Sequence, residues 1–254
     1  MAEQEPGGVD ILAIAAHPDD VELHIAGTVM KSIAQGHRVA ICDLTAGERG
    51  SRGSRQLRQQ ETAAANTILG IPEGNRVNLG IPDGDIQLSP ANVLKVVGVI
   101  RRFRPRVILF PAQRDRHPDH EAAHQLVCRA YFDAGLIAVE SNDDDGRAQS
   151  PHRPVRMFMY SHSWEDEPDF VVDISDFFER KLDGLAAYGS QFSVPGRNVE
   201  DPAMGPQTFI SSNEFMEYYI ARMRRLGFQI GARYGEGFQT WGGPLKVEDL
   251  LSTV

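Results

Sequence analysis

The sequence is short of cysteine, of positive charge and of long apolar runs, and each shortage argues against a class of protein. Its 254 residues include only two cysteines, Cys42 and Cys128, which are too few for a disulfide framework or a thiolate zinc site. No apolar run reaches the roughly 18 residues that indicate a membrane-spanning helix. The 35 acidic residues outnumber the 26 basic ones, which argues against nucleic acid or an anionic membrane surface as a partner. A small-molecule substrate is the remaining expectation.

The first ten residues, MAEQEPGGVD, also lack the basic start and apolar core of a secretory signal, so we expect a cytoplasmic protein. Hydrophobic residues make up 41% of the chain and charged residues 24%, which is the ordinary composition of a globular protein. This length is sufficient for one substantial core, so a single domain over residues 1–254 is predicted.

Apolar runs alternate with segments of helical periodicity along the chain. The apolar runs, which are typical of strands covered on both faces, lie at residues 10–16, 38–44, 76–80 and 106–111. The segments with helical spacing lie at residues 21–35, 57–70 and 89–103. This alternation predicts an α/β fold with a doubly wound, mostly parallel sheet and helices on both faces, of the Rossmann type.

The C-terminal part of the chain is less regular. A strand is predicted at FVVDI, and helices are predicted at residues 175–188 and 212–227. The segments SQFSVPGRNVEDPAMGPQ and YGEGFQTWGGP are rich in glycine and proline, so both are expected to be loops. Such loops either close over a site or make subunit contacts.

Two His-Pro-Asp triplets stand directly after predicted strands. The first, at residues 17–19, follows the first strand in the stretch AAHPDDVELH, and the second, at residues 117–119, follows the strand that ends at Pro111. Ligands of open α/β sheets bind beyond the carboxyl ends of the strands, so both triplets are expected at one edge. Adjacent carboxylates repel each other. Their presence here therefore indicates a cation site.

The residue types favour zinc, with other divalent metals left open. A catalytic zinc takes three protein ligands, often histidine nitrogens and a carboxylate, and keeps a fourth position for water. His17, Asp20 and His120 supply such a set, for one ion per chain. Zinc polarises both a water molecule and a carbonyl group, so hydrolysis of an amide is the expected reaction.

Three further residues of the two triplets have roles that suit this reaction. Asp19 is the candidate general base. His117 is expected to stabilise the oxyanion or to protonate the leaving amine. Asp119 is expected to hold the His117 ring in one tautomer and to keep it cationic.

At these residues the sequence resembles a known family, the LmbE/PIG-L zinc-dependent N-acetylglucosamine deacetylases. The resemblance is carried by AAHPDDVELHIAGT and DRHPDH, and it extends through CDLTAGERGSRG, LRQQE, NLGIPDG, AYGSQF and YGEGF. It implies an LmbE-like fold, zinc bound by His17, Asp20 and His120, and Asp19 as the general base. The further segments, outside the two motifs, most resemble those of the bacillithiol-pathway deacetylases. They imply N-acetylglucosaminyl malate as substrate and, because relatives are often hexameric, a homo-oligomer.

The resemblance also implies two substrate-binding residues, Arg58 in LRQQE and Asp83 in IPDG. Simpler interpretations stay open for both. Arg58 is also consistent with a surface arginine paired with Glu61, although the substrate contact is favoured, and Asp83 is equally consistent with a turn residue before Gly84. The basic segment ERGSRGSR, residues 48–55, is expected to be a flexible loop that either meets an anionic malate group or is solvated.

Two rival functions compete with the deacetylase. The segment HEAAH, from His120 to His124, matches the H-E-x-x-H motif of zinc metallopeptidases, in which both histidines bind the metal and Glu121 is the base. That hypothesis leaves HPDD without a role. A non-catalytic ligand-binding module is the other alternative, but no G-x-G-x-x-G or P-loop motif follows the first strand. His24 is expected to pack within its helix, and His162 follows the strand-like segment MFMY.

Overall fold

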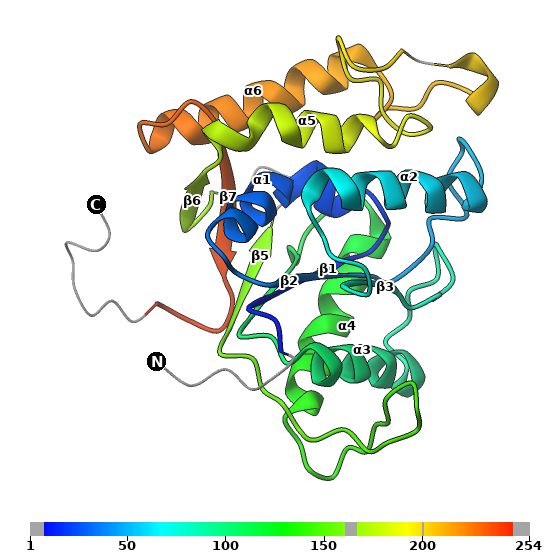
Figure 1. The fold of residues 1–254 in the computed structure, drawn as a ribbon, viewed down its shortest axis with the longest axis vertical. Coiled ribbons are helices and arrows are strands. Elements are labelled where there is room, and N and C mark those ends of the chain that lie inside the picture. The colour runs from blue at the N-terminus through cyan, green and yellow to red at the C-terminus, as the bar shows by residue number, and fades with distance from the viewer. Residues whose placement is uncertain (1–7, 161–166, 200, 246–254) are drawn as a thin grey trace.

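A computed structural model describes residues 8–160, 167–199 and 201–245. Its centre is a seven-stranded sheet with the order β3-β2-β1-β4-β5-β7-β6, which Figure 1 shows between two sets of helices. The strands are β1 (Ile11–Ala15), β2 (Val39–Asp43), β3 (Arg76–Asn78), β4 (Val107–Pro111), β5 (Arg156–Tyr160), β6 (Phe170–Asp173) and β7 (Gly235–Thr240). His162, which follows the segment MFMY, lies outside the described residues.

Five of these strands run parallel, as predicted. β1 pairs with both β2 and β4, β3 pairs with β2, and β5 pairs with β4, all in parallel register. The apolar runs of β1, β2 and β4 are buried almost throughout because helices cover both faces of the sheet. The pairing of β1 with β4 puts the chain after Ala15 beside the chain after Pro111.

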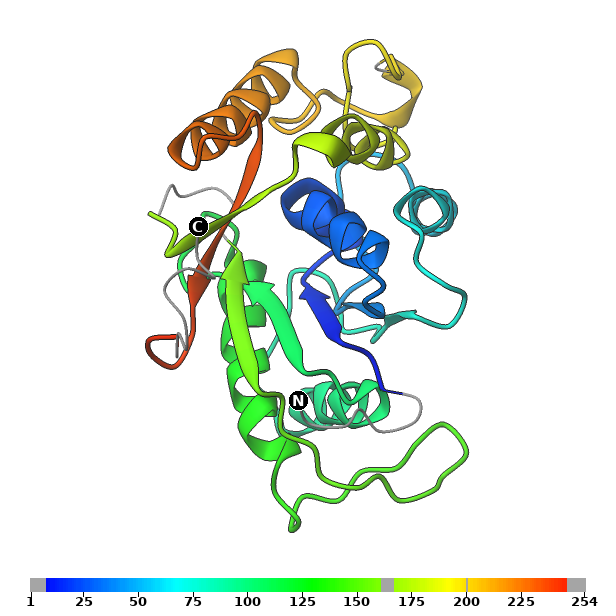
Figure 2. The same cartoon turned by 60° about the vertical axis from the view of Figure 1, so that its left-hand side comes forward.

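Helices cover the sheet on both faces (Figures 1 and 2). They are α1 (Asp20–Ala34), α2 (Arg55–Leu69), α3 (Pro90–Phe103), α4 (Pro118–Ala134), α5 (Phe178–Ala186) and α6 (Asn213–Gln229). One apolar core joins α3 and α4 to one face of the sheet, and a second joins α1 to the other face. A third core lies outside α1 and α2, where α5 and α6 pack on them. None of the described helices has the length and apolar character that crossing a membrane requires.

The expectation that YGEGFQTWGGP forms a loop is wrong, because its first half is strand β7. This strand pairs antiparallel with both β5 and β6, inside the sheet. Its glycines allow a close approach: a Cβ on Gly235 would lie 2.5 Å from Val171 Cγ1 and 2.9 Å from the Gly227 nitrogen. Glycine is normally unfavourable within a strand. At this position it is favoured because α6 and β6 leave no room for a side chain.

Candidate active site

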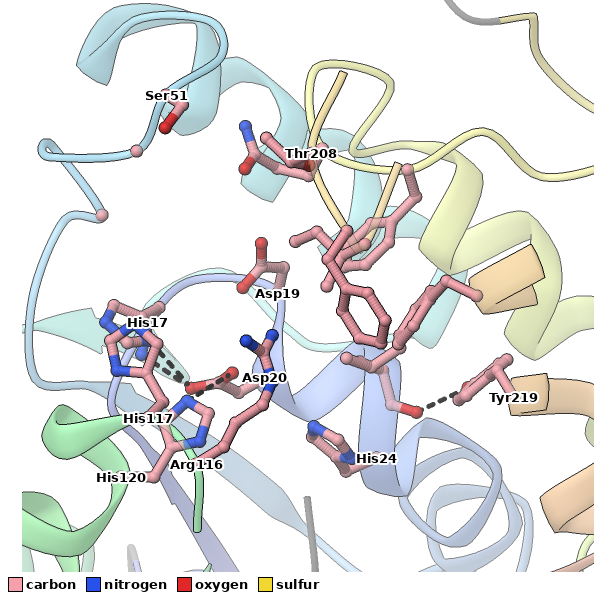
Figure 3. Close-up of a pocket in the computed structure, with 18 of the residues that line it drawn as sticks. His17, Asp19, Asp20, His24, Ser51, Arg116, His117, His120, Thr208 and Tyr219 are labelled. Atoms are coloured by element: carbon pink, nitrogen blue, oxygen red, sulfur yellow. Dashed lines mark hydrogen bonds and ion pairs between the residues drawn. The ribbon is translucent and has the colours of Figure 1, made fainter. Parts of the chain in front are cut away.

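The two His-Pro-Asp triplets meet at one edge of the sheet, as their positions after β1 and β4 predict. His17 follows β1, Asp20 begins α1, and His120 lies in the first turn of α4. Figure 3 shows the rings of His17, His117 and His120 gathered beside Asp20. Asp19 connects β1 to α1 with a φ of 127°, a backbone region that non-glycine residues rarely adopt and that is typical of strained functional loops.

Three side chains offer a compact set of metal ligands. His17 Nδ1 lies 3.5 Å from Asp20 Oδ2, and His120 Nε2 lies 3.4 Å from Asp20 Oδ1. One ligand atom from each of these residues lies within 4.8 Å of the others. Two imidazole nitrogens and a carboxylate form the donor set that zinc and similar divalent cations take in catalytic sites. These residues therefore fit the cation that the sequence predicts.

The outer nitrogens of both rings are held by carboxylates. His17 Nε2 lies 3.2 Å from Asp83 Oδ1 and 3.2 Å from Asp119 Oδ2. His120 Nδ1 lies 3.0 Å from Asp115 Oδ1. Metal-binding histidines usually donate their second ring N–H to such a partner, which fixes the tautomer and the ring orientation. The inner atoms, His17 Nδ1 and His120 Nε2, are thereby directed at Asp20.

The charge state of the site follows from the same contacts. Burial lowers the pKa of His17, but hydrogen bonds with Asp119 and Asp20 raise it well above 6.5. Burial also opposes the charged form of His120, yet the charge of Asp20 and the hydrogen bond with Asp115 raise its pKa to about 9. The carboxylates thus attract positive charge to this edge, and a bound divalent cation would supply it in place of protons.

Asp19 and Arg58 form an ion pair in the wall of the site. Arg58 Nη1 lies 3.2 Å from Asp19 Oδ2 and donates to the Pro18 carbonyl oxygen at 3.2 Å. Burial raises the pKa of Asp19 to about 7, against the opposing charge of Arg58. Glu61 Oε2 lies 3.9 Å from Arg58 Nε. This Nε atom has no hydrogen-bond partner among the described residues. Arg58 is therefore a buried residue of the site and not a surface arginine, although its predicted neighbour Glu61 is beside it.

The predicted contact between the Asp119 carboxylate and the His117 ring is absent. Asp119 Oδ2 instead faces His17 and accepts a hydrogen bond from the Gly84 nitrogen at 2.8 Å. His117 is the N-cap of α4, so its Nδ1 accepts from the Asp119 backbone nitrogen at 3.2 Å. Burial, together with the charges of His17 and His120, lowers the pKa of His117. In this arrangement the Asp119 backbone, and not its carboxylate, contacts the His117 ring, and the catalytic roles of both residues stay predictions.

Asp83 lies within this charged cluster. Besides its contact with His17, its Oδ2 accepts from the Arg49 backbone nitrogen at 2.7 Å. Burial opposes ionisation of Asp83, but these two partners lower its pKa to about 2. The turn at Gly84 is also present, with a φ of 70°. Asp83 thus combines the turn position with a contact to a predicted metal ligand.

Sequence reasoning missed Asp115, although it lies in the quoted segment QRDRHPDH. Its Oδ1 contacts His120 and also accepts from the His117 backbone nitrogen at 2.8 Å. The available signal was a carboxylate five residues before a predicted histidine ligand. A histidine ligand normally has such a partner. Searching the sequence for one would have identified Asp115.

The structure does not support the metallopeptidase motif. His124 Nδ1 lies 3.0 Å from the Pro111 carbonyl oxygen, and its ring stacks on Phe110 at 5.1 Å. Glu121 accepts a hydrogen bond from the Asp115 nitrogen at 3.1 Å. Among the described residues, His124 belongs to no group that could hold a metal. The second histidine of HEAAH therefore packs in the fold, as expected for the deacetylase alternative.

The basic loop at residues 48–55 is not simply solvated, because one of its arginines is buried in the fold; contact of the loop with an anionic malate group stays a prediction. Arg52 is buried, and its guanidinium donates to the carbonyl oxygens of Ser190, Asp201, Gly205 and Pro206. It therefore ties this loop to the segment that precedes α6. Other residues of the same loop, Arg49 and Ser51, line a cavity in front of the metal-ligand set.

A cavity of about 740 Å³ opens in front of the metal-ligand set. One side carries the charged residues of the two triplets together with Arg58 and Asp83. The opposite side comes from the segment before α6 and from α6 itself, and it includes Phe192, Phe209 and Phe215. His24 also lines the cavity, with its ring stacked on Tyr160. A volume of this size is typical of a small-molecule site.

Comparison with known proteins identifies the family. A family profile described as PIG-L: GlcNAc-PI de-N-acetylase matches residues 12–131. The diacetylchitobiose deacetylase of Thermococcus kodakarensis is 30% identical over 195 residues, which cover 72% of this chain and 70% of the relative. The chain belongs to the PIG-L/LmbE family of deacetylases. All eight site residues that the sequence predicts lie within the matched segment of this family member.

Two further relatives of this PIG-L/LmbE deacetylase bear on substrate and fold. A probable N-acetyl-alpha-D-glucosaminyl L-malate deacetylase 2 of Bacillus cereus is 26% identical over 198 residues, covering 71% of this chain and 83% of the relative. The crystal structure of the conserved protein TT1542 from Thermus thermophilus is 37% identical, with a TM-score of 0.78. That match covers 94% of this chain and 98% of TT1542, so it supports the predicted α/β fold.

Proposed function

We propose that this protein is a zinc-dependent N-deacetylase that hydrolyses the acetamide of an N-acetylglucosaminide. The observation that carries the proposal is the arrangement of His17, Asp20 and His120. Their inner atoms converge, while carboxylates hold the outer nitrogens of both rings. Three ligands of this kind leave a fourth position for water and substrate. A bound zinc ion supplies Lewis-acid activation of the water and of the amide carbonyl.

In this proposal the remaining residues move protons and orient the substrate. Asp19 takes the proton of the attacking water, since its carboxylate lies beside the ligand set in the cavity wall. Arg58 holds Asp19 in place through their ion pair. His117 accepts a hydrogen bond at Nδ1, so a neutral ring carries its proton on Nε2. That proton is available to the oxyanion or to the leaving amine.

The proposed substrate is N-acetylglucosaminyl malate, within bacillithiol biosynthesis. Support comes from the Bacillus cereus relative, whose name specifies this malate glycoside, and from four arginines that line the cavity: Arg49, Arg58, Arg116 and Arg222. Guanidinium groups suit a dicarboxylate. The extent of the deacetylase domain over residues 1–254, the cytoplasmic location and the homo-oligomer stay predictions.

Acetate release tests this function directly. Purified protein with measured metal content is assayed on N-acetylglucosaminyl malate, methyl N-acetylglucosaminide and a peptide substrate. We expect release from both sugars, faster from the malate, and no cleavage of the peptide. Full activity of a metal-free preparation would refute the proposed mechanism. Equal rates on the two sugars would refute the malate assignment alone.

A further inference from the structure

His24 projects from α1 into the cavity, beside the predicted metal ligand Asp20. It stands one helical turn after Asp20, and residues four positions apart lie on the same face of a helix. Every other residue from 21 to 30 is buried, whereas His24 keeps part of its surface exposed. Because His24 also lines the cavity, this exposed surface belongs to the candidate site.

His24 stands apart from the predicted metal ligands. Figure 3 shows it on the side of Asp20 away from His17 and His117, toward Tyr219. Among the described residues, the groups that could hold a metal include the other three histidines of the cavity but not His24. A role for His24 therefore has to come from its contact with a substrate.

The His24 ring is neutral. Burial lowers its pKa well below 6.5, and the positive charges of Arg222 and His120 act in the same direction, against the charge of Asp20. A divalent cation bound beside Asp20 would lower this pKa further. His24 therefore contributes shape to the cavity and no charge.

The ring is also fixed in place. It stacks on the Tyr160 ring, with the two centres 6.0 Å apart and the planes inclined by 20°. Tyr160 is fully buried, and its hydroxyl donates to the Ile14 carbonyl oxygen of β1 at 2.8 Å. A substrate group that needs the space of the His24 ring would have to displace close-packed side chains of the sheet, which is costly.

His24 lies at the closed end of the cavity. The mouth is lined by exposed residues: Arg49, Ser51, Arg116, Glu214 and Tyr218. At the end where His24 lies, the lining residues Leu23 and Tyr219 are only 8% and 5% exposed. In the proposed reaction the amide carbon lies at the metal-ligand set and joins the sugar to the acyl methyl group. The sugar and its aglycone need the open end, so the acyl group takes the closed end.

We propose that His24 sets the upper limit on the size of the acyl group, so that the site accepts N-acetyl and excludes longer N-acyl groups. This inference rests on the proposed deacetylation and defines the acyl part of its substrate. The ring occupies the space beyond Asp20 into which a propionyl or butyryl chain would extend. It places no restriction on the aglycone, so a malate glycoside is compatible with it.

A ratio of rates tests this limit. Wild type and His24→Ala are assayed on methyl glucosaminides with N-acetyl, N-propionyl or N-butyryl groups, and the released amine is measured. We expect the kcat/KM of wild type to fall about tenfold with each added methylene, the usual effect of a methylene on fit to a pocket. In His24→Ala the butyryl-to-acetyl ratio of kcat/KM should rise at least about tenfold. An unchanged ratio would overturn the proposal.

The ratio isolates the role of His24 from damage to the protein. Both substrates are assayed on the same preparation, so the ratio does not depend on metal content or on the folded fraction. Alanine also keeps the helical propensity of α1. His37→Ala is the matched control, because His37 is exposed and does not line the cavity, and it should leave the ratio unchanged.

A second substitution separates ring size from hydrogen bonding. His24→Phe keeps a ring in this position without the two nitrogens, and it should retain the preference for acetyl. Relaxed selectivity in His24→Phe, equal to that in His24→Ala, would show that the nitrogens and not the size of the ring set the limit. That result would overturn the proposal.

Binding gives a measurement that does not depend on turnover. Zinc-loaded Asp19→Asn protein, with and without His24→Ala, is titrated calorimetrically with the N-acetyl and N-butyryl compounds. We expect the butyryl compound to bind about tenfold more weakly than the acetyl compound when His24 is present, because the added methylenes overpack a fixed site. The two compounds should bind about equally when His24 is replaced. Equal binding in both proteins would also overturn the proposal.

Acetate release by zinc-loaded wild type from methyl N-acetylglucosaminide keeps this test separate from the test of function. Absence of release would count against the proposed function, while the binding titration would still test the limit set by His24. Release combined with a butyryl-to-acetyl ratio that is the same in wild type and His24→Ala would retain the deacetylase and remove the role of His24.

Discussion

The two halves of the molecule contribute different things to one cavity. The parallel half, from β1 to α4, supplies the charged residues of the two triplets after β1 and β4, together with Arg58 of α2 and Asp83 after β3. The C-terminal half adds α5, α6, β6 and β7, and it lines the opposite side of the cavity with both aromatic and polar residues, among them Phe209, Glu214 and Arg222. The residues proposed to react therefore come from one part of the chain, and most of the opposite lining of the cavity comes from the other.

Helix α1 lies between these halves and is held from both sides. On one side Arg76 lies 2.6 Å from Glu22 and 2.8 Å from Asp43. On the other, Glu236 of β7 accepts from the backbone nitrogens of Gly27 at 3.0 Å and Thr28 at 2.7 Å. Because α1 begins with Asp20, the contacts of Arg76 and the contacts of Glu236 both help to fix the position of a predicted metal ligand. The comparison of the two halves can thus be tested by removing one contribution at a time.

The largest effect is expected from the charged half. Asp20→Ala should abolish metal binding and reduce acetate release to background, because the carboxylate lies between both histidine ligands. Metal per chain is measured by mass spectrometry, together with activity, on folded protein. His124→Gln is the control, and it should keep its metal and at least a tenth of the activity, since His124 contacts Pro111 and Phe110. Loss of metal from the control would revive the metallopeptidase alternative.

The next largest effect concerns the anchor in the other half. Lys181 is fully buried, and its Nζ is paired with Glu236 Oε1 at 2.5 Å. In Glu236→Gln, Lys181 loses this counter-charge. We expect a loss of about 3–5 kcal/mol in the free energy of unfolding, the usual cost of breaking a buried ion pair. Urea denaturation measures it.

Two further variants show whether this loss arises from the buried charge. Adding Lys181→Met to Glu236→Gln should recover part of the lost stability. Glu179→Gln breaks the exposed ion pair between Glu179 Oε2 and Arg197 Nη2, which lie 2.6 Å apart. This change should lower the free energy of unfolding by less than about 1 kcal/mol. Equal losses in Glu236→Gln and Glu179→Gln would contradict the proposed anchor.

A smaller effect separates the base from the ligands. Asp19→Asn should keep its metal but lower kcat by about 100-fold, the typical contribution of a positioned general base. Asparagine is the appropriate replacement because it tolerates the positive φ of 127° at this position better than alanine does. Metal content and steady-state kinetics are compared with those of wild type. Loss of metal from Asp19→Asn would mean that Asp19 is itself a ligand.

The sequence predicted the parallel half well because local signals and topology agree there. Apolar runs identified β1, β2 and β4, and the rule that ligands bind at strand ends brought His17 and His120 together. The partner of each ring was harder to predict. Asp119 follows His117 closely in sequence, but the N-cap geometry of α4 turns its carboxylate toward His17. Contacts of this kind depend on the backbone geometry at the end of a helix, and the sequence separation of the two residues does not predict them.

In the C-terminal half the predictions of a strand at FVVDI and of helices at residues 175–188 and 212–227 are confirmed by β6, α5 and α6, but β7 was missed. Strand β7 contains Gly235 and Gly237, which favour a loop by composition, yet they are present because α6 and β6 pack against them. The lining of the cavity likewise combines Leu23 with residues almost two hundred positions later. No local pattern encodes such contacts. Glu236 was missed too, because a carboxylate within a glycine-rich segment gives no sign that it binds a helix backbone.

The smallest effect is expected at the outer edge of the C-terminal half, where β6 meets the end of β7. Asp169 Oδ2 accepts from the Thr240 nitrogen at 2.6 Å and from its hydroxyl at 2.7 Å. These two hydrogen bonds lower the pKa of Asp169 below its ordinary 3.8. The ionised carboxylate therefore stabilises the fold above that pH, and this stabilisation is lost as the pH falls through the lowered value.

Asp169→Asn should accordingly lower the free energy of unfolding at pH 7, by less than about 1 kcal/mol because the pair is exposed. The difference from wild type should shrink as the pH falls below 3.8, where the native carboxylate also becomes protonated. Urea denaturation at a series of pH values measures this difference. Asp144→Asn, in an exposed loop, is the control for removing a surface charge. A difference that stays constant with pH would show that ionisation of Asp169 does not stabilise this edge, and packing of β6 on β7 would then be what holds it.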